Sequence, residues 1–299
     1  MKLFLRLLRE SFIFSFNSII ANPVRTILSL LGVTIGIFTI IAVLSTVDSL
    51  ERSIKDNLSF LGTDNLRVEK WPWDFDNPSY EWWKFWKRPE PIYREYEFLR
   101  DNLSTAQSVE ISASRGISNV KYLNNSSSVD NLNGVVFENQ FFFDWDFVVG
   151  RFFTQNETII GLDAVIIGYK IMEDLFRTPE NALGKQIKIK GRTFTVIGVQ
   201  NEQGESFGAG DTFDRQMSIP YNTFKKMFRV GGKGSDAVIR IKGDSEIDPG
   251  LVNLEYEVKG LLRAKRGLKP LEEDNFAINR PEYLASFIST IFGLSLIHI

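Results

Sequence analysis

The chain has 299 residues and a formal net charge of −2, so it lacks the basic excess that a nucleic-acid-binding protein needs. It has no cysteine and a single histidine, His298, which excludes disulfides, thiolate catalysis and metal sites built on Cys or His clusters. Hydrophobic residues make up 43% of the chain, enough for a sizeable core. We therefore expect neither a nucleic acid partner nor a bound metal or cofactor.

The first distinctive segment is the uncharged, strongly apolar stretch 26–47. A helix of that length rises about 33 Å, which matches a hydrocarbon core of about 30 Å. The sequence predicts a transmembrane helix at 21–47, with Pro23 near its start. A cleaved signal peptide is the alternative, although its apolar core is usually shorter. The basic residues before the stretch favour a cytoplasmic N-terminus and an extracytoplasmic remainder; they are Lys2, Arg6, Arg9 and Arg25.

Residues 1–20 are predicted to form an amphipathic helix that lies in the cytoplasmic membrane interface and contacts lipid. Over 2–10 the charged side chains fall on one arc of a helix and apolar side chains cover the rest. The alternative is a plain extension of the membrane helix. Within that membrane helix, Gly32 and Gly36 have the spacing that lets two helices pack closely in lipid.

The helical pattern continues outward from the membrane segment as a stalk. Apolar residues recur at spacings of three and four from Val47 to Leu61, and Gly62 is a natural C-cap. We expect 48–281 to be an extracytoplasmic domain, and the stalk to carry any motion of the membrane helix into it.

Most of the chain's tryptophans lie in one short segment, 71–89; they are Trp71, Trp73, Trp82, Trp83 and Trp86. Tryptophan favours boundaries between wet and apolar surroundings, which indicates a loop that contacts the membrane interface or a partner. The alternative is a long loop that packs these rings into its own domain.

The outer domain alternates short strands and helices without the regular spacing of a parallel sheet, which predicts an α+β fold with two subdomains. We expect strands at 65–70, 109–114, 118–123, 134–137, 164–167, 187–190, 193–199, 218–220 and 237–242. We expect helices at 93–103, 138–149, 170–176, 221–228 and 249–266, and a turn or loop at the Asn/Ser-rich run 124–128.

No motif for catalysis or nucleotide binding is present. The chain has no G-x-S-x-G, no H-E-x-x-H and no G-x-x-x-x-G-K-[ST] phosphate-binding loop. The acidic residues within 205–214 lack the alternating spacing of a calcium loop, which indicates a flexible loop. We expect no catalytic residue and no enzyme activity in this chain.

Several stretches resemble the MacB/FtsX-type permeases of ABC transporters, which carry a MacB-like periplasmic core domain. They are NPVRTILSLLGVTIGI at 22–37, GRFFTQNE at 150–157, AVIIGYKIMEDLF at 164–176, ALGKQIKIKGRTFTVIGVQ at 182–200, MSIPYNTF at 217–224 and LLRAKRGLKPLEEDNFAINRPE at 261–282. In that family the outer domain lies between the first two of four membrane helices. The apolar residues at 282–299 then resemble the start of the second membrane helix, cut short, with a buried terminal helix as the alternative.

The resemblance implies a non-catalytic permease subunit in the bacterial cytoplasmic (inner) membrane, working as a homodimer or with a paralogous permease. Its partners would be a cytoplasmic ABC ATPase and a periplasmic adaptor. Only 25 residues precede the apolar stretch, so we expect the ATPase to be a separate subunit, coupled through Lys2, Arg6, Arg9 and Arg25. ATP-driven motion would be relayed outward for efflux. The alternative is an FtsX-like signalling or assembly module that regulates cell-envelope enzymes. The Trp-rich segment is not part of the family pattern.

Overall fold

The computed structural model describes residues 2–59, 64–73, 80–203, 213–230 and 235–281, together with Leu284 and Phe287. The chain divides into two compact units, Met1–Ser53 with Phe292–Ile299, and Ile54–Ile291. The predicted helix cap at Gly62, most of the loop 205–214 and most of the predicted second membrane segment at 282–299 lie outside the described residues.

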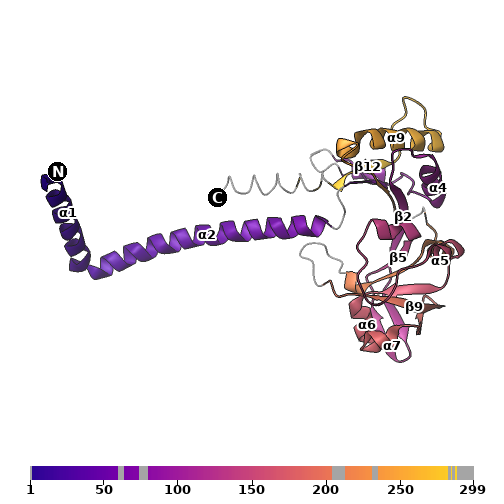
Figure 1. Ribbon diagram of the computed structural model, residues 1–299, viewed down its shortest axis with the longest axis horizontal. Helices are drawn as coiled ribbons and strands as arrows, with labels where there is room; N and C mark the ends of the chain where they lie inside the picture. The colour runs from indigo at the N-terminus through magenta and orange to yellow at the C-terminus, as the bar shows by residue number, and fades with distance from the viewer. Residues whose placement is uncertain are drawn as a thin grey trace. The chain divides into compact units, whose positions relative to one another are not determined.

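Two helices make up the described part of the N-terminal unit. Helix α1 (Lys2–Ala21) ends before Asn22, and helix α2 (Pro23–Ser59) begins at the proline, whose missing N–H costs nothing in a first helical turn. The two are therefore separate helices, not one extended rod. Helix α2 has 37 residues and continues without interruption into the larger unit (Figure 1).

The larger unit is built around a mixed sheet. Its described strands form a 12-stranded sheet in the order β12-β1-β11-β2-β5-β10-β7-β9-β8-β3-β4, with β6 added against β9. The strands are β1 (Asn65–Glu69), β2 (Ser108–Gly116), β3 (Asn119–Tyr122), β4 (Asn125–Ser128), β5 (Asn131–Val135), β6 (Phe147–Gly150), β7 (Ala164–Ile167), β8 (Gln186–Ile189), β9 (Arg192–Gln200), β10 (Gln216–Pro220), β11 (Asp236–Lys242) and β12 (Ala277–Asn279). Only β5–β10 and β7–β9 are parallel among the described pairs.

The helices cover this sheet at separate places. They are α3 (Trp82–Phe85), α4 (Tyr93–Asn102), α5 (Gln155–Ile160), α6 (Tyr169–Phe176), α7 (Pro179–Ala182), α8 (Tyr221–Met227) and α9 (Val252–Arg266), with short 3₁₀ turns η1 (Phe137–Phe141), η2 (Phe213–Arg215) and η3 (Pro249–Leu251). In Figure 1, α9 and α4 lie together near β2 and β12, whereas α6 and α7 lie beside β9. The α+β class is confirmed. The larger unit is one compact unit around one continuous sheet, and the expected division into two subdomains stays a prediction.

The core follows from the alternation of apolar residues along the strands. Strand β11 buries Ala237, Ile239 and Ile241 while the residues between them stay partly exposed, as expected for a strand with one face covered by helices. Strand β7 is buried along its whole length, because it lies between β10 and β9 in the middle of the sheet. These side chains join the apolar faces of α4, α6, α8 and α9 in one large cluster.

Most predicted elements are confirmed, including the hairpin of β8 and β9 and the helices at α4, α6, α8 and α9. The helix predicted at 138–149 is wrong. That segment forms the short turn η1 and then β6, which pairs with β9. Asn139 explains the change. Its side-chain Nδ2 donates to Glu110 Oε2 at 3.2 Å, and its Oδ1 accepts from Trp145 Nε1 at 3.2 Å, which holds the segment against β2.

The turn or loop predicted at 124–128 is wrong for 125–128, although Asn124 does lie in a turn. Residues Asn125–Ser128 form β4, which pairs antiparallel with β3. The hydroxyl of Ser127 is buried and donates to Asp174 Oδ2 of α6 at 2.7 Å. A remote helix therefore stabilises a strand whose own residues have low β-propensity.

Candidate functional site

The described span of α2 is long and apolar enough to cross a membrane. The most apolar 18-residue window of Pro23–Arg52 has a mean hydropathy of 2.7, and none of that window is buried inside the protein. Large side chains such as Ile27, Leu28 and Phe38 are more than 60% exposed. Apolar side chains pointing outward all round a helix are typical of a segment surrounded by lipid or by other membrane helices.

Several residues singled out from the sequence lie on these two helices. Arg9 on α1 and Arg25 on α2 are exposed, and Lys2 and Arg6 belong to α1. Gly32 and Gly36 lie one turn apart on α2, and a Cβ added to either would meet no described atom within 4 Å. That face of α2 therefore has room for the close approach of a second helix.

The first and last strands of the larger unit, β1 and β12, are neighbours in the sheet. β1 follows α2 in the sequence, and β12 precedes residues 282–299. Strand β1, the first after α2, pairs antiparallel with β12, and Arg67 lies opposite Asn279. The amide of Asn279 donates to the Trp71 carbonyl at 2.8 Å and accepts the Trp73 N–H at 2.9 Å. Main-chain and side-chain hydrogen bonds thus join β12 to β1 and to the residues that follow β1.

The five tryptophans differ in exposure, although Trp71 and Trp86 are in edge-to-face contact with ring centroids 6.1 Å apart. Trp71 and Trp73 are partly buried and lie under cations, with Lys70 Nζ 5.2 Å from the Trp71 ring and Arg67 Cζ 5.0 Å from the Trp73 ring. The other three are more than half exposed; they are Trp82, Trp83 and Trp86. The structure therefore supports the internal-packing alternative for the first pair and leaves a surface of indole rings on and after α3.

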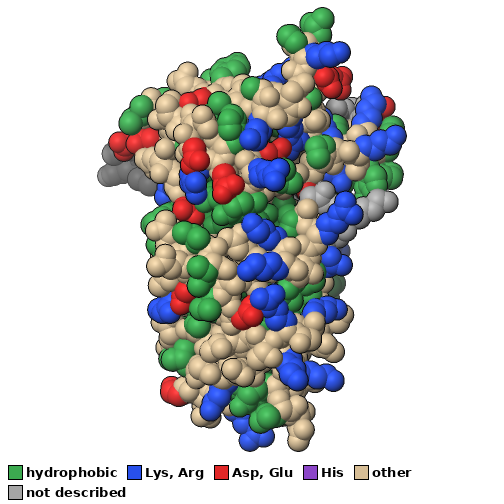
Figure 2. Space-filling view, turned by 90° about the vertical axis from the view of Figure 1, so that its right-hand side faces the viewer, with side chains coloured by type: hydrophobic (Ala, Val, Ile, Leu, Met, Phe, Trp, Pro, Cys, Tyr) green, Lys and Arg blue, Asp and Glu red, His purple; other side chains and the backbone are tan. Residues whose placement is uncertain are grey.

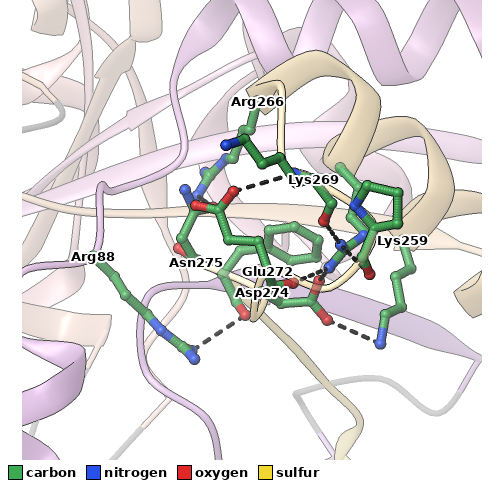
Figure 3. Close-up of polar contacts among 10 residues, drawn as sticks. Arg88, Lys259, Arg266, Lys269, Glu272, Asp274 and Asn275 are labelled. Atoms are coloured by element: carbon green, nitrogen blue, oxygen red, sulfur yellow. Dashed lines mark hydrogen bonds and ion pairs between the residues drawn. The ribbon is translucent and has the colours of Figure 1, made fainter.

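A network of charged groups ties the segment before β12 to two helices. Arg266 of α9 reaches Glu95 of α4 through Nε–Oε1 at 2.8 Å and Nη2–Oε2 at 3.0 Å. Its Nη1 also donates to the carbonyl and the side chain of Asn275, each at 2.9 Å. Figure 3 shows Arg266 and Asn275 beside the loop that leads into β12.

Asp274 is the second centre of this network. It accepts from Lys259 Nζ at 2.9 Å and from Arg263 Nη1 (Figure 3). Burial acts to raise the pKa of Asp274, but the hydrogen bonds from Lys259 and Arg263 bring it below its ordinary value. Arg88, after α3, donates to the Phe276 carbonyl at 3.2 Å. The loop 267–276 is therefore held on both sides, so α4, α9 and β12 form one connected block.

A family model for the MacB-like periplasmic core domain matches residues 26–266. This chain belongs to the family of proteins with a MacB-like periplasmic core domain.

Curated relatives of this MacB-like chain include exporters from two bacteria. It is similar to the macrolide export ATP-binding/permease protein MacB of Chlorobium phaeobacteroides, with 26% identity over 280 residues, 92% of this chain and 40% of the relative. It is also similar to the pyoverdine export ATP-binding/permease protein PvdT of Pseudomonas fluorescens, with 24% identity over 204 residues, 67% of this chain and 29% of the relative. The chain thus spans less than half the length of these relatives.

Two solved structures share the fold. The periplasmic region of MacB from Actinobacillus actinomycetemcomitans matches 78% of this chain and 96% of its own with a TM-score of 0.58 at 20% identity. The extracellular domain of the noncanonic ABC-type transporter YknZ from Gram-positive bacteria matches 72% of this chain and 100% of its own with a TM-score of 0.53 at 22% identity.

The MacB-like domain also contains a cavity that the sequence did not reveal. It has a volume of about 730 Å³ and lies on the face formed by β2, β5, β10 and β11. At its floor Arg240 of β11 pairs with the fully buried Glu110 of β2 and donates to Ser112 Oγ at 2.6 Å. Burial, followed by the charge of Arg240, lowers the pKa of nearby Arg67.

The lining of this cavity offers hydrogen-bonding and stacking groups. Its walls carry amides and aromatic rings, among them Asn133, Gln216, Phe143 and Trp145. Amides both donate and accept hydrogen bonds, and rings stack on flat or apolar groups. Glu110 and Arg240 stand in register across β2 and β11, a pairing that neither strand's sequence reveals alone.

Proposed function

We propose that this chain is a non-catalytic permease subunit of an ABC transporter of the export type. It relays the ATP-driven motion of a separate cytoplasmic ATPase to an extracytoplasmic domain. The single observation that carries the proposal is the continuity of α2, a single helix that contains a membrane-length apolar span and runs on to Ser59, past the start of the larger unit at Ile54. A helix transmits tilt and translation along its axis, because its backbone hydrogen bonds make it stiff.

The block around β12 supports the relay. Motion arriving through β1 reaches β12 through the hydrogen bonds of Asn279, and it reaches α4 and α9 through Glu95 and Arg266. The chain has no phosphate-binding loop, so ATP hydrolysis belongs to the partner in this scheme. We place the N-terminus in the cytoplasm and the larger unit outside, because Lys2, Arg6 and Arg9 precede the span.

A proline in the stalk tests the relay. Since the chain has no cysteine, Ile247→Cys supplies a single label at a position that is 82% exposed. In membranes with the ATPase, the label should report an ATP-dependent change. Ser49→Pro should abolish that change, because proline removes a helical hydrogen bond and kinks the helix, whereas Ser49→Ala should preserve it. An undiminished response in the proline variant would contradict the relay.

The same label tests the orientation. A membrane-impermeant maleimide should react with Cys introduced at Ile247 in cells whose outer barrier is opened but whose cytoplasmic membrane is intact. Labelling only after that membrane is lysed would place the domain in the cytosol and overturn the proposal. An exporter further predicts cargo-stimulated ATP hydrolysis in the reconstituted complex. Its absence would favour the FtsX-like signalling module.

We propose that α1 lies in the cytoplasmic interface and contacts the ATPase. Its separation from α2 at Asn22 and the exposure of Arg9 support this placement. Deleting residues 2–10 should reduce recovery of the ATPase in a pull-down from membranes. Equal recovery would remove α1 from the coupling.

We propose that the face of α2 with Gly32 and Gly36 packs against the same helix of a second permease subunit. Replacing both glycines by leucine should weaken cross-linking between subunits, because bulky side chains hold the backbones apart. Thr34→Leu, on another side of α2, should leave the cross-linking unchanged. Equal cross-linking in the glycine double variant would remove this face from the contact.

The exposed indoles of Trp82, Trp83 and Trp86 are proposed as a surface for a partner protein, since tryptophan dominates many interface cores. Trp82→Ser with Trp83→Ser should keep the unfolding midpoint and reduce recovery of the assembled transporter. Unchanged recovery would exclude this role.

A further inference from the structure

An open groove with a volume of about 750 Å³ lies between α4 and α8. The described residues that line it include four cations and one carboxylate, which are Arg94, Lys225, Lys226, Arg229 and Glu97. The groove is therefore positive, although the whole chain has a net charge of −2. Such a reversal of sign concentrates the electrostatic potential at one place on the surface.

The cations of this groove have little internal compensation. Arg94, Lys225 and Arg229 are exposed, and none of them forms an ion pair with another described residue. Lys226 donates to the Ile160 carbonyl at 3.3 Å, which is a neutral acceptor. By contrast, the exposed Lys170 lies 3.2 Å from Glu202.

Aromatic and aliphatic side chains also line the groove. The rings of Tyr93 and Tyr221 are stacked, with centroids 5.4 Å apart, and Lys225 Nζ lies 4.3 Å from the centre of the Tyr93 ring. Ile92 is 40% exposed, and Phe228 completes an apolar wall. Burial lowers the pKa of Lys225. A ligand anion beside Lys225 would raise that pKa again, because an opposite charge favours the protonated form.

The side of the larger unit that bears α4 and α5 carries a broad positive region. Figure 2 shows Lys and Arg side chains gathered along one side of that face, with hydrophobic side chains between them and few Asp or Glu. A surface on which cations alternate with apolar side chains complements a ligand in which acidic groups alternate with apolar groups.

We infer that the groove between α4 and α8 binds an acidic, amphipathic segment of an extracytoplasmic partner protein. Carboxylates of that segment meet Arg94, Lys225 and Arg229, and its apolar side chains pack on Ile92, Tyr93 and Phe228. The groove is far larger than a phosphate ion, and its cations come from α4, from α8 and from the segment just after α8, which suits an extended chain. The inference rests on the proposed function only in placing this surface outside the membrane.

The test uses the full chain in a non-ionic detergent. The probe is a fluorescein-labelled peptide of 15 residues in which pairs of Glu alternate with pairs of Leu, read by fluorescence anisotropy. We expect saturable binding that weakens as the salt concentration rises, because exposed charges are screened. Arg94→Glu with Lys225→Glu should weaken binding at least tenfold. A control peptide has Gln in place of every Glu. Its affinity for the wild type should be no higher than the affinity of the acidic peptide for the double variant Arg94→Glu with Lys225→Glu.

The matched control reverses two exposed lysines elsewhere, Lys185→Glu with Lys188→Glu, which changes the net charge equally. It should change the affinity less than twofold. Equal weakening in both double variants, or no binding of the acidic peptide, would overturn the inference. So would binding of vesicles containing phosphatidylglycerol that depends on Arg94 and Lys225 while the peptide does not bind. The binding assay contains no ATPase, so a failure to bind the peptide would leave the proposed relay intact. Conversely, labelling that places the larger unit in the cytosol would contradict the relay without changing the measured peptide affinity.

Discussion

Arg266 and Glu95 form a two-point ion pair between α9 and α4, with the two side chains only 5% and 8% exposed. The geometry is that of a planar guanidinium facing both carboxylate oxygens, the strongest arrangement for such a pair. It joins two helices that are far apart in the sequence, and the hydrogen bonds of Arg266 to Asn275 extend it to the loop before β12.

Removing one member of this pair should be costly. Glu95→Leu leaves the Arg266 guanidinium buried without its carboxylate, which costs about 3–5 kcal/mol of unfolding free energy. Glu95→Leu with Arg266→Leu should recover part of that loss, because two apolar groups can pack together. Urea unfolding of the detergent-solubilised chain measures both. Asp101→Asn, which breaks the exposed pair with Arg100, is the control and should have little effect. A single variant as stable as that control would show that the buried pair is unimportant.

A second prediction concerns acid. Hydrogen bonds from Arg151 to Glu157, at 2.7 and 2.8 Å, together with the Thr154 backbone N–H, lower the pKa of Glu157 to about 2. The folded-state pKa lies below the unfolded value of about 4.3, so this stabilisation is present above the unfolded pKa and is lost as pH falls through the folded one. The difference in unfolding midpoint between wild type and Glu157→Gln should therefore shrink from about pH 5 to about pH 2. A difference independent of pH over that range would disprove the linkage.

Two buried tyrosines should respond oppositely to loss of the hydroxyl. The Tyr221 hydroxyl is buried without a hydrogen-bond partner among the described residues, and burial raises its pKa. Tyr221→Phe should stabilise the fold by up to about 1 kcal/mol, because an unsatisfied buried group is removed. The Tyr96 hydroxyl donates to Glu138 Oε2 at 3.1 Å, so Tyr96→Phe should cost about 1 kcal/mol. Thermal unfolding compares the two, and equal destabilisation would contradict the assignment.

Substitution of two glycines by alanine should also change the stability in opposite directions. A Cβ at Gly134 of β5 would lie 2.5 Å from Phe224 Cβ, so Gly134→Ala forces α8 away from the sheet and should cost about 1–3 kcal/mol. Gly260 of α9 has no described atom within 4 Å of the added Cβ, so Gly260→Ala should stabilise α9 by about 1 kcal/mol. Urea midpoints of the two variants should move in opposite directions. If Gly260→Ala destabilised the protein as much as Gly134→Ala, the close packing of α8 on β5 would not explain the destabilisation by Gly134→Ala.

Local patterns in the sequence determined much of this protein. The apolar span within α2 follows from composition alone, because a lipid-facing helix needs about twenty apolar residues and nothing from the rest of the chain. Strand β11 and helix α6 follow from periodicity, since each buries the face that its own spacing of apolar residues defines.

Only the tertiary structure decided which remote groups meet. Ser127 lies in a strand because Asp174 of α6 accepts its hydrogen bond, and Asn139 ends a would-be helix because Glu110 and Trp145 bind its amide. Likewise, Arg94 and Lys225 share one groove only because α8 packs beside α4. Sequence spacing carries no information on such contacts, because they depend on how strands pair across the sheet and how helices pack on it.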